Sequence, residues 1–295
     1  MNIGEKIKKL RTKKLMTQSE LAGNVITRNM LSSIENGTAL PSLTTLCHIS
    51  AKLNVPAGYL LATGDDEMIY LKLSEISNIK NAYLSGNFKI CRDMCVNTEM
   101  ERDDEINLIF AECSLSLGIE CFNEGMLHSA VAYFDEAIEI SSQTIYNTQH
   151  ISAVAAVYFR YMGRISATLS SDMIDESDAD IYAALSDDFS RYVVSFEALD
   201  NGNLELSEHL VSALDENAPY ALHIGARYDM KNGDYEGAYQ KLYRILINPY
   251  KIQEPLMYFV FGDLEVCCKE RKDFKGAYEY SNDKIEILQK LLTDN

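Results

Sequence analysis

The side chains best suited to binding chemistry near the start of the chain lie in residues 26–37, ITRNMLSSIENG. In the major groove of DNA, an arginine can pair with guanine through two hydrogen bonds, and an asparagine can pair with adenine in the same way. The segment combines both side chains with two serines on what would be one short helix. It is therefore a candidate for reading DNA bases. The polar residues expected to face outward are Arg28, Asn29, Ser32 and Ser33.

The spacing of apolar and capping residues must hold this helix in place. Leu31 and Ile34 are three residues apart and would anchor one side in a core. Thr27 is suited to cap the first turn, and Asn36 with Gly37 is typical of a left-handed stop. The pattern predicts a short helix with a buried side and a polar side.

Four other short helices are expected in the first 64 residues. Thr17 and Glu20 form a capping box for the second helix, Ser42 caps the fourth, and Pro56 opens the fifth. The first helix has one apolar and one basic side. The apolar side consists of Ile3, Ile7 and Leu10, and the basic side consists of Lys6, Lys9 and Lys13.

Charge divides the chain near residues 62–68, ATGDDEM. Residues 1–64 hold eight Lys and Arg against three Glu, which gives +5, and the rest of the chain carries −22. A basic module suits a polyanion such as nucleic acid, whereas an acidic module repels it. We therefore expect a DNA-binding domain over residues 1–64 and a separate regulatory and dimerisation domain over residues 65–295.

Three segments of the first domain together resemble the Xre and phage-repressor family of helix-turn-helix domains, over about residues 3–62. They are TQSELA, ITRNMLSSIENG and PSLTTLCHISAKLNV. The resemblance implies that Gln18 and Thr27 face phosphates, and that Arg28, Asn29 and Ser33 occupy base-reading positions.

Two further points follow from comparison with that family. The resemblance implies a structural ion pair between Arg11 and Glu35. The family usually has a glycine in the turn before the recognition helix, whereas LAGNVIT is one residue shorter there. We expect the shorter turn to alter the exact base contacts more than DNA binding itself.

The acidic part contains an internal repeat. A glycine, any residue, an apolar residue, two more residues and a small residue recur at intervals of 39, 38, 39, 31 and 39 residues. Such regularity is typical of stacked helix pairs with a tight turn inside each pair. We expect about six pairs over residues 68–295. The copies begin at Gly86, Gly125, Gly163, Gly202 and Gly233, and the sixth begins at Lys272 instead of a glycine.

The two best copies resemble tetratricopeptide repeats. They are LGIECFNEGMLHSAVAYFDEAIEI and GARYDMKNGDYEGAYQKLYRIL. The expected fold is therefore all-α, with a five-helix lambda-repressor-like domain followed by a right-handed α-solenoid of tetratricopeptide-like helix pairs. The residues that fall on the packing positions of the repeat are Leu117, Gly118, Ala130, Phe134 and Ala137.

In such solenoids, the first helix of each pair lines the concave face. Arginines and amides among aromatic residues there would suit a peptide's carboxylate, backbone and apolar side chains. Ordinary packing between repeats is an equally good interpretation of each residue alone. The candidate peptide-binding residues are Asn123, Arg160, Tyr161, Tyr192, Phe196, His223, Arg227 and Met230, with Tyr83 and Tyr220 nearby in the pattern.

The two parts together resemble the peptide-pheromone-responsive regulators of the Rgg and PlcR type. The resemblance implies a cytoplasmic homodimer on a near-palindromic DNA site, regulated by a short signal peptide in the solenoid. Two alternatives remain open: the repeat domain binds a protein partner, or it serves only as a dimerisation scaffold.

No motif of the sequence indicates catalysis. The five histidines are dispersed, and there is no HExxH pair, GxSxG elbow or glycine-rich phosphate loop. Seven unpaired cysteines favour a reducing compartment, and Cys91 and Cys95 fall on core positions rather than in a metal site. We expect no enzyme activity, catalytic residue, cofactor, metal or membrane association, and a cytoplasmic location.

Overall fold

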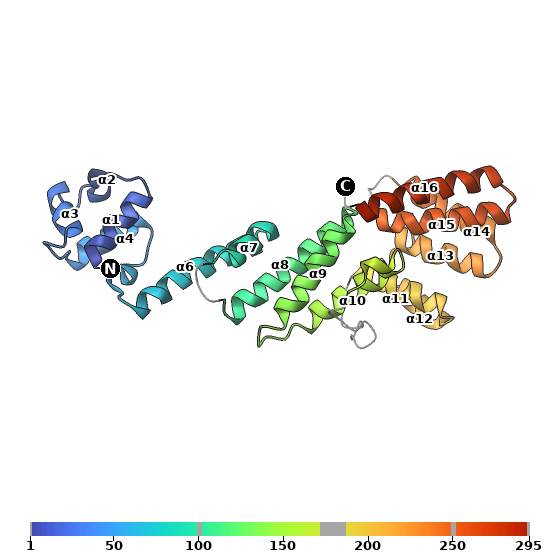
Figure 1. Cartoon of the computed structure of the whole chain (residues 1–295), viewed down its shortest axis with the longest axis horizontal. Helices are drawn as coiled ribbons and strands as arrows, with labels where there is room; N and C mark the ends of the chain where they lie inside the picture. Colours follow the sequence, from blue (N-terminus) through green and yellow to red (C-terminus); the bar gives the residue numbers. More distant parts are fainter. Residues whose placement is uncertain (1, 99–101, 172–186, 249–251, 294–295) are drawn as a thin grey trace. The chain divides into compact units, whose positions relative to one another are not determined.

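The computed structural model describes residues 2–98, 102–171, 187–248 and 252–293. Over these residues the chain forms sixteen α-helices and one 3₁₀ helix, and no strand (Figure 1). The helices group into two compact units, Met1–Asn81 and Ala82–Asn295. The predicted all-α fold is confirmed.

The first unit contains the five short helices that the sequence predicts. Thr17, Thr27 and Ser42 each cap a helix by accepting a hydrogen bond from a backbone N–H. Gly37 adopts the left-handed conformation, with φ of 72°, after the third helix. The helices are α1 (Ile3–Lys13), α2 (Gln18–Ala22), α3 (Arg28–Glu35), α4 (Leu43–Leu53) and α5 (Ala57–Leu61), followed by α6 (Asp65–Leu84).

An apolar core shared by these helices fixes α3. A Cβ atom at Gly4 would overlap the carbonyl oxygen of Ile34, so that α1 and α3 pack backbone against backbone. The polar residues of α3 are thereby left on the side away from the core. The buried core residues are Ile7, Leu21, Ala22, Leu31, Ile34, Leu46, Ile49, Leu53 and Leu60.

Lys6 corrects one expectation about the first helix. We placed it on the basic outer side of α1, but it is only 1% exposed. Its Nζ donates to the carbonyl oxygen of Tyr59, at 3.2 Å, and to that of Ala62. The last carbonyls of a helix lack partners within the helix, and a buried ammonium group can satisfy them. Tertiary contact with the end of α5 therefore overrides the helical pattern.

The start of α6 packs on the first unit. A Cβ atom at Gly58 would overlap the Tyr70 hydroxyl, and the Tyr70 ring lies edge-on to Tyr59 with 6.4 Å between ring centroids. The first compact unit accordingly extends to Asn81. The functional boundary between residues 64 and 65 stays a prediction.

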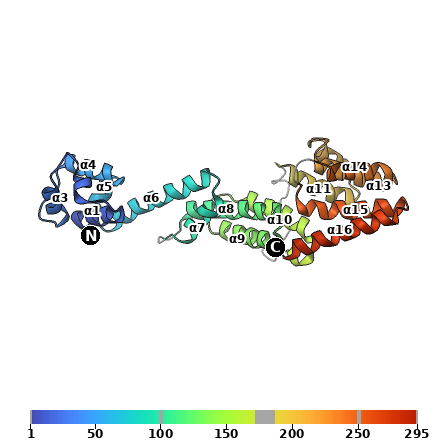
Figure 2. The same ribbon diagram turned by 90° about the horizontal axis from the view of Figure 1, so that it is seen from above.

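The second unit is built from helix pairs joined by tight turns (Figures 1 and 2). Gly125, Gly202 and Gly233 open these turns with φ of 80° to 81°, and Lys272 has φ of 63° at the corresponding position. The helices are α7 (Phe88–Val96), α8 (Asp104–Asn123), α9 (Leu127–Ser141), α10 (Gln149–Gly163), α11 (Asp188–Asp200), α12 (Leu204–Val211), α13 (Pro219–Lys231), α14 (Tyr235–Leu246), α15 (Glu254–Glu270) and α16 (Phe274–Thr293).

The predicted packing positions of the repeat are confirmed in the α8–α9 pair. Ala130, Phe134 and Ala137 are fully buried on α9. A Cβ atom at Gly118 would lie only 2.6 Å from the Phe134 ring, so the absence of a side chain allows α8 and α9 to approach. Leu117 is buried beside it.

Only the start of the third copy of the repeat lies within the described residues. After Gly163, the structure has only a short 3₁₀ helix, Ala167–Leu169, and residues 172–186 lie outside the described residues. The Ser166 hydroxyl accepts a hydrogen bond from the backbone N–H of Thr168 and also bonds to its hydroxyl. The Ser166 hydroxyl thereby caps the 3₁₀ helix, and whether a second helix of this copy forms is not tested within the described residues.

The last helix pair returns to the second pair of the unit. Helices α15 and α16 contact α8 and α9 respectively. Phe259 of α15 packs against Tyr161 and Phe196, with ring centroids 5.0 and 5.4 Å apart. Aromatic side chains therefore fill the space between the first helices of several pairs. In the described part of the chain, no helix is long and apolar enough to cross a membrane.

Candidate DNA interface and candidate ligand site

Helix α3 presents the candidate base-reading residues. Arg28 and Asn29 in its first turn are exposed, and Ser32 and Ser33 are partly exposed. Within the described residues, no hydrogen bond or ion pair holds the side chains of Arg28 or Asn29. Since Leu31 anchors the opposite side of α3 in the core, these polar side chains are free to meet an outside partner.

The helix ends around α3 are fixed by a polar cluster. Thr27 caps α3 by accepting from the N–H of Met30, at 3.2 Å. Arg11 Nε lies 2.6 Å from Glu35 Oε1, so the predicted ion pair is present. Gln18 Nε2 donates to Glu35 Oε2 at 2.8 Å. An amide NH₂ group has two donors, so this bond leaves one for a phosphate oxygen.

The pKa of Glu35 reflects this cluster. Burial of its side chain would raise the pKa, but hydrogen bonds from Arg11 and Gln18 and the positive charge of Arg11 outweigh burial. The pKa therefore lies below its usual value, and the carboxylate stays ionised. The charge locks α1, α2 and α3 together beneath the candidate interface.

Four lysines of the first unit extend into solvent. Such side chains suit contacts with phosphates that do not depend on DNA sequence. Lys6 is not among them, because it is buried against α5. The exposed lysines of α1 and the turn after it are Lys8, Lys9, Lys13 and Lys14.

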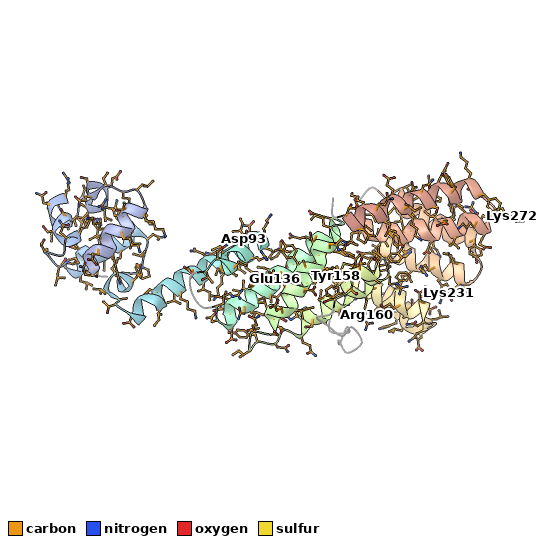
Figure 3. The ribbon with its side chains drawn as sticks, in the orientation of Figure 1. Asp93, Glu136, Tyr158, Arg160, Lys231 and Lys272 are labelled. Carbon is orange, nitrogen blue, oxygen red and sulfur yellow. The ribbon has the colours of Figure 1, made fainter. Side chains whose placement is uncertain are left out.

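In the second unit, two of the candidate ligand residues already have partners at its centre. Asn123 Oδ1 accepts from Gln253 Nε2 at 2.6 Å, and Tyr220 donates to the Oε1 of the same glutamine at 2.5 Å. Arg160 Nη1 lies 3.1 Å from Glu197 Oε2. Figure 3 labels Arg160 on α10. These contacts join α8 and α13 to the start of α15, and α10 to α11.

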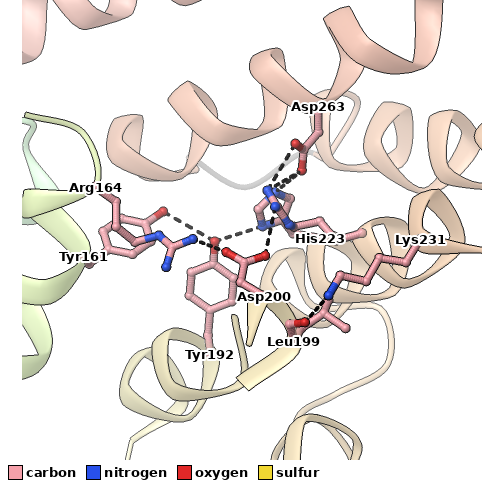
Figure 4. Close-up of polar contacts among 9 residues, drawn as sticks. Tyr161, Arg164, Tyr192, Leu199, Asp200, His223, Lys231 and Asp263 are labelled. Atoms are coloured by element: carbon pink, nitrogen blue, oxygen red, sulfur yellow. Dashed lines mark hydrogen bonds and ion pairs between the residues drawn. The ribbon is translucent and has the colours of Figure 1, made fainter. Parts of the chain in front are cut away.

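Four other candidates are buried together, and three of them, Tyr161, Tyr192 and His223, form a polar chain (Figure 4). Tyr161, Tyr192, Phe196 and His223 are each 0% exposed. The Tyr161 hydroxyl donates to the carbonyl oxygen of Pro255, at 3.3 Å. It also lies 3.5 Å from the hydroxyl of Tyr192. The Tyr192 hydroxyl is 2.8 Å from His223 Nδ1. Burial raises the pKa of both tyrosines, which keeps their hydroxyl groups neutral.

The buried chain ends at an arginine that reaches the surface. His223 Nε2 lies 3.0 Å from Asp263 Oδ2, and Arg227 Nη1 is 3.2 Å from the same carboxylate. Arg227 Nη2 is 3.1 Å from Asp200 Oδ1. Arg164 pairs with the other oxygen of Asp200. The guanidinium carbons of Arg164 and Arg227 lie 4.1 and 4.4 Å from the centroid of the Phe196 ring.

Met230 lies at the open end of this arrangement. It lines a hollow of about 220 Å³ together with Arg227, Lys231, Tyr235 and Val266. Lys231 donates to the carbonyl oxygen of Leu199 at the end of α11. The hollow therefore has an apolar lining and a basic side.

The structure divides the eight predicted ligand residues into two groups. Asn123, Arg160, Arg227 and Met230 are partly exposed, whereas the other four are buried in the polar and aromatic network. The sequence prediction omitted Arg164, Asp200 and Asp263. The spacing of Phe196 and Asp200, four residues apart at the end of one helix, is the signal that was available. Contact of any of these residues with a peptide stays a prediction.

The cysteines at the repeat positions are part of the core. Cys91 and Cys95 are both 0% exposed, as their positions in the repeat predict. Within the described residues, no group of three or more His, Cys, Asp or Glu side chains is arranged to hold a metal ion.

Comparison with known proteins identifies the first unit. Residues 7–60 match the family model described as helix-turn-helix. This match spans α2 and α3, so the first unit contains a helix-turn-helix DNA-binding domain. No curated protein sequence matches the chain.

Three solved structures are similar to the chain over most of its length. PlcR of Bacillus thuringiensis, in complex with the peptide PapR7 and DNA, is 15% identical, covers 98% of this chain and 95% of its own, and gives a TM-score of 0.22. The apo competence regulator ComR of Streptococcus vestibularis is 14% identical, with 97% of each chain covered and a TM-score of 0.25. The SHP pheromone receptor Rgg2 of Streptococcus dysgalactiae is 15% identical, covers 97% and 99%, and gives 0.20.

Proposed function

We propose that this protein is a sequence-specific transcriptional regulator in which α3 reads DNA bases through Arg28 and Asn29. The observation that supports this best is the pairing of a buried anchor, Leu31 and Ile34, with unpartnered polar side chains on the opposite side. The formal charge of +5 over residues 1–64 favours approach to DNA. Gln18 and Thr27 at helix starts would contact phosphates, and Ser32 and Ser33 would complete the surface.

The protein would bind a near-palindromic site as a homodimer. One recognition helix covers only part of a site, and two-fold symmetry of the protein matches two-fold symmetry of the DNA. In this proposal, residues 1–64 bind DNA, and residues 65–295 dimerise and regulate.

The regulatory part would sense a short signal peptide. The partly exposed Asn123, Arg160, Arg227 and Met230 offer an amide, two guanidinium groups and an apolar side chain, which are the groups that a peptide's termini and side chains require. A peptide must bind one arrangement of the dimer better than another, because equal affinity for both would shift nothing.

A second candidate function has its own supporting observation. Tyr161, Tyr192, Phe196 and His223 are wholly engaged with one another and with neighbouring helices. Such burial favours a repeat domain that acts as a dimerisation scaffold or docks a protein partner on its outer surface.

The deciding experiment selects DNA and ligand together. Purified protein is incubated with fragmented genomic DNA of the source organism, with and without the peptide fraction of spent medium, and bound fragments are sequenced. A shared two-fold symmetric motif whose recovery depends on the peptide fraction supports the proposal. A motif that no peptide fraction alters favours the scaffold or protein-partner function, and the absence of any shared motif contradicts sequence-specific binding.

A further inference from the structure

We propose that Arg164, Phe196 and Arg227 form a carboxylate-binding site that Asp200 occupies in this structure, and that an acidic group of the ligand exchanges with Asp200. The inference rests on the proposed peptide-sensing function and adds the chemical class of the group that the peptide must present. That group is a carboxylate, from either the peptide's C-terminus or an acidic side chain.

The geometry is that of a site built for one planar anion. The guanidinium carbons of Arg164 and Arg227 lie 4.1 and 4.4 Å from the centroid of the Phe196 ring. Both guanidinium groups donate to Asp200 (Figure 4). The cation–π contacts with the ring hold both guanidinium groups in place, because Phe196 itself is fully buried. Guanidinium groups held in place are suited to bind carboxylates through directed pairs of N–H donors.

The charge of the site exceeds what its own carboxylates neutralise. Arg164, Arg227 and Lys231 provide three positive charges, and Asp200 and Asp263 provide two negative charges. This local excess is found in a part of the chain whose formal charge is −22. An anionic ligand would therefore be attracted to this place rather than to the acidic remainder.

Asp200 is the carboxylate that can leave. Its side chain is 27% exposed, and those of Arg164 and Arg227 are 29% and 24% exposed, so the three groups can be reached from solvent. Asp263 is less exposed, at 12%, and is held by His223 from beneath. Exchange at Asp200 would thus keep the buried polar chain intact.

The neighbouring hollow gives the rest of a ligand a place. Arg227 belongs both to the carboxylate cluster and to the lining of the hollow with Met230 and Val266. A peptide with its carboxylate on Arg227 could place an adjacent apolar side chain there. Lys231 on the same lining would add a positive charge close to the bound group.

Competition with Asp200 sets the requirement for binding. Asp200 belongs to the same chain and therefore acts at a high effective concentration. A free carboxylate alone binds poorly, and a peptide displaces Asp200 only with the help of its other contacts. Removing the Asp200 charge should strengthen the binding of acidic ligands.

The first test uses succinate as a simple carboxylate probe on the full-length protein. The arginine side-chain Nε signals are followed by NMR in wild type, in Asp200→Asn and in the matched control Asp188→Asn. Asp188 also pairs with an arginine on α11, but it is 65% exposed and outside the cluster. The proposal expects the Arg164 and Arg227 signals of Asp200→Asn to shift at a succinate concentration at least tenfold lower than in wild type or the control. Equal responses in all three proteins overturn it.

The second test uses random synthetic heptapeptides in three sets: with free C-termini and acidic residues, with amidated C-termini and acidic residues, and with amidated C-termini and none. Retention that requires a carboxylate, and that rises about tenfold in Asp200→Asn, supports the proposal and identifies which carboxylate is bound. Retention of all three sets alike overturns the carboxylate site but leaves peptide sensing standing. Retention of no set by any of the proteins contradicts both.

A second variant, which removes a guanidinium group instead of the carboxylate, keeps the proposal testable if Asp200→Asn fails to fold. Arg164→Gln leaves the contact between Arg227 and Asp200 in place and removes one of the two guanidinium groups. The proposal expects its retention of carboxylate-bearing heptapeptides to fall about tenfold, with unchanged retention of the third set. Unchanged retention of every set overturns the proposal.

Discussion

The two units use their polar side chains in opposite ways. On α3, Arg28 and Asn29 project from a fixed helix, and within the described residues no hydrogen bond or ion pair holds their side chains. In the second unit, Arg164, Arg227 and Arg160 all lie against carboxylates of the chain itself. The first surface is ready for a partner, whereas the second must give up a contact of its own to accept one. Regulation through exchange is a natural consequence of that difference.

The largest effect is expected from a substitution in the ion-pair network of the second unit. Asp263→Ala removes the carboxylate that His223 and Arg227 share. Removing it leaves His223 Nε2 and Arg227 Nη1 without their acceptor, although Arg227 keeps Asp200, and the loss of such a buried partner costs roughly 3 kcal/mol. Urea denaturation should show this loss in the free energy of unfolding of the second unit. Asp188→Ala should change it by less than about 0.5 kcal/mol; equal losses in the two variants would show that the network is not special.

The next effect sharpens the description of α3 as an open surface. Asn29→Ala should weaken binding to the selected DNA site by about 1–3 kcal/mol and relax base preference at one position, because a bidentate base contact is lost. Its affinity for random DNA should stay close to that of wild type. Titration of both DNAs in one buffer checks this, and equal weakening on both would contradict base reading by Asn29.

A smaller effect concerns the support beneath α3. The pKa of Glu35 is below its usual value, so its ionised form stabilises the folded state above the pKa of an unfolded glutamate, about 4.3. That stabilisation is lost as the pH falls through the lower folded-state pKa. Glu35→Gln should therefore flatten the decline in stability of the first unit in this acidic range. Denaturation curves at stepped pH would reveal it, and an unaltered slope would contradict the assigned role.

The smallest effect separates phosphate contacts from base contacts. Lys9→Ala should lower affinity for every DNA sequence alike and reduce the slope of log affinity against log salt by about 1, since one counterion fewer is released. Affinities measured between low and moderate salt give the slope. A change confined to the selected site would place Lys9 among the base-reading residues instead.

Local signals explain what the sequence predicts well. Thr17, Thr27 and Ser42 act within their own first turns, so their capping roles are visible without knowledge of the rest of the fold. The recurring glycine likewise marks turns whose geometry depends on a few neighbouring residues. The structure confirms the five short helices and most of the helix pairs that these features predict.

Long-range contacts explain what the sequence could not give. Lys6 lies at a position that looks basic and external, but the carbonyl oxygens at the end of α5 and the Tyr59 ring make its burial favourable. The carboxylate cluster draws Arg164, Asp200, Arg227 and Asp263 from four helices that no short pattern connects. The predicted concave face included Arg227, but neither Arg164 nor the aspartates that hold the two arginines.

The lysine at the turn between α15 and α16 bears on how such a repeat can diverge. Lys272 keeps the left-handed backbone that glycine adopts in the other turns, with φ of 63°, although a residue with a side chain costs about 1 kcal/mol more there. The copies therefore share a backbone conformation at the turn. The residue type at that position can change once the neighbouring helices hold the conformation in place. Ancestry of this kind is traced more faithfully by the succession of left-handed turns than by residue identity.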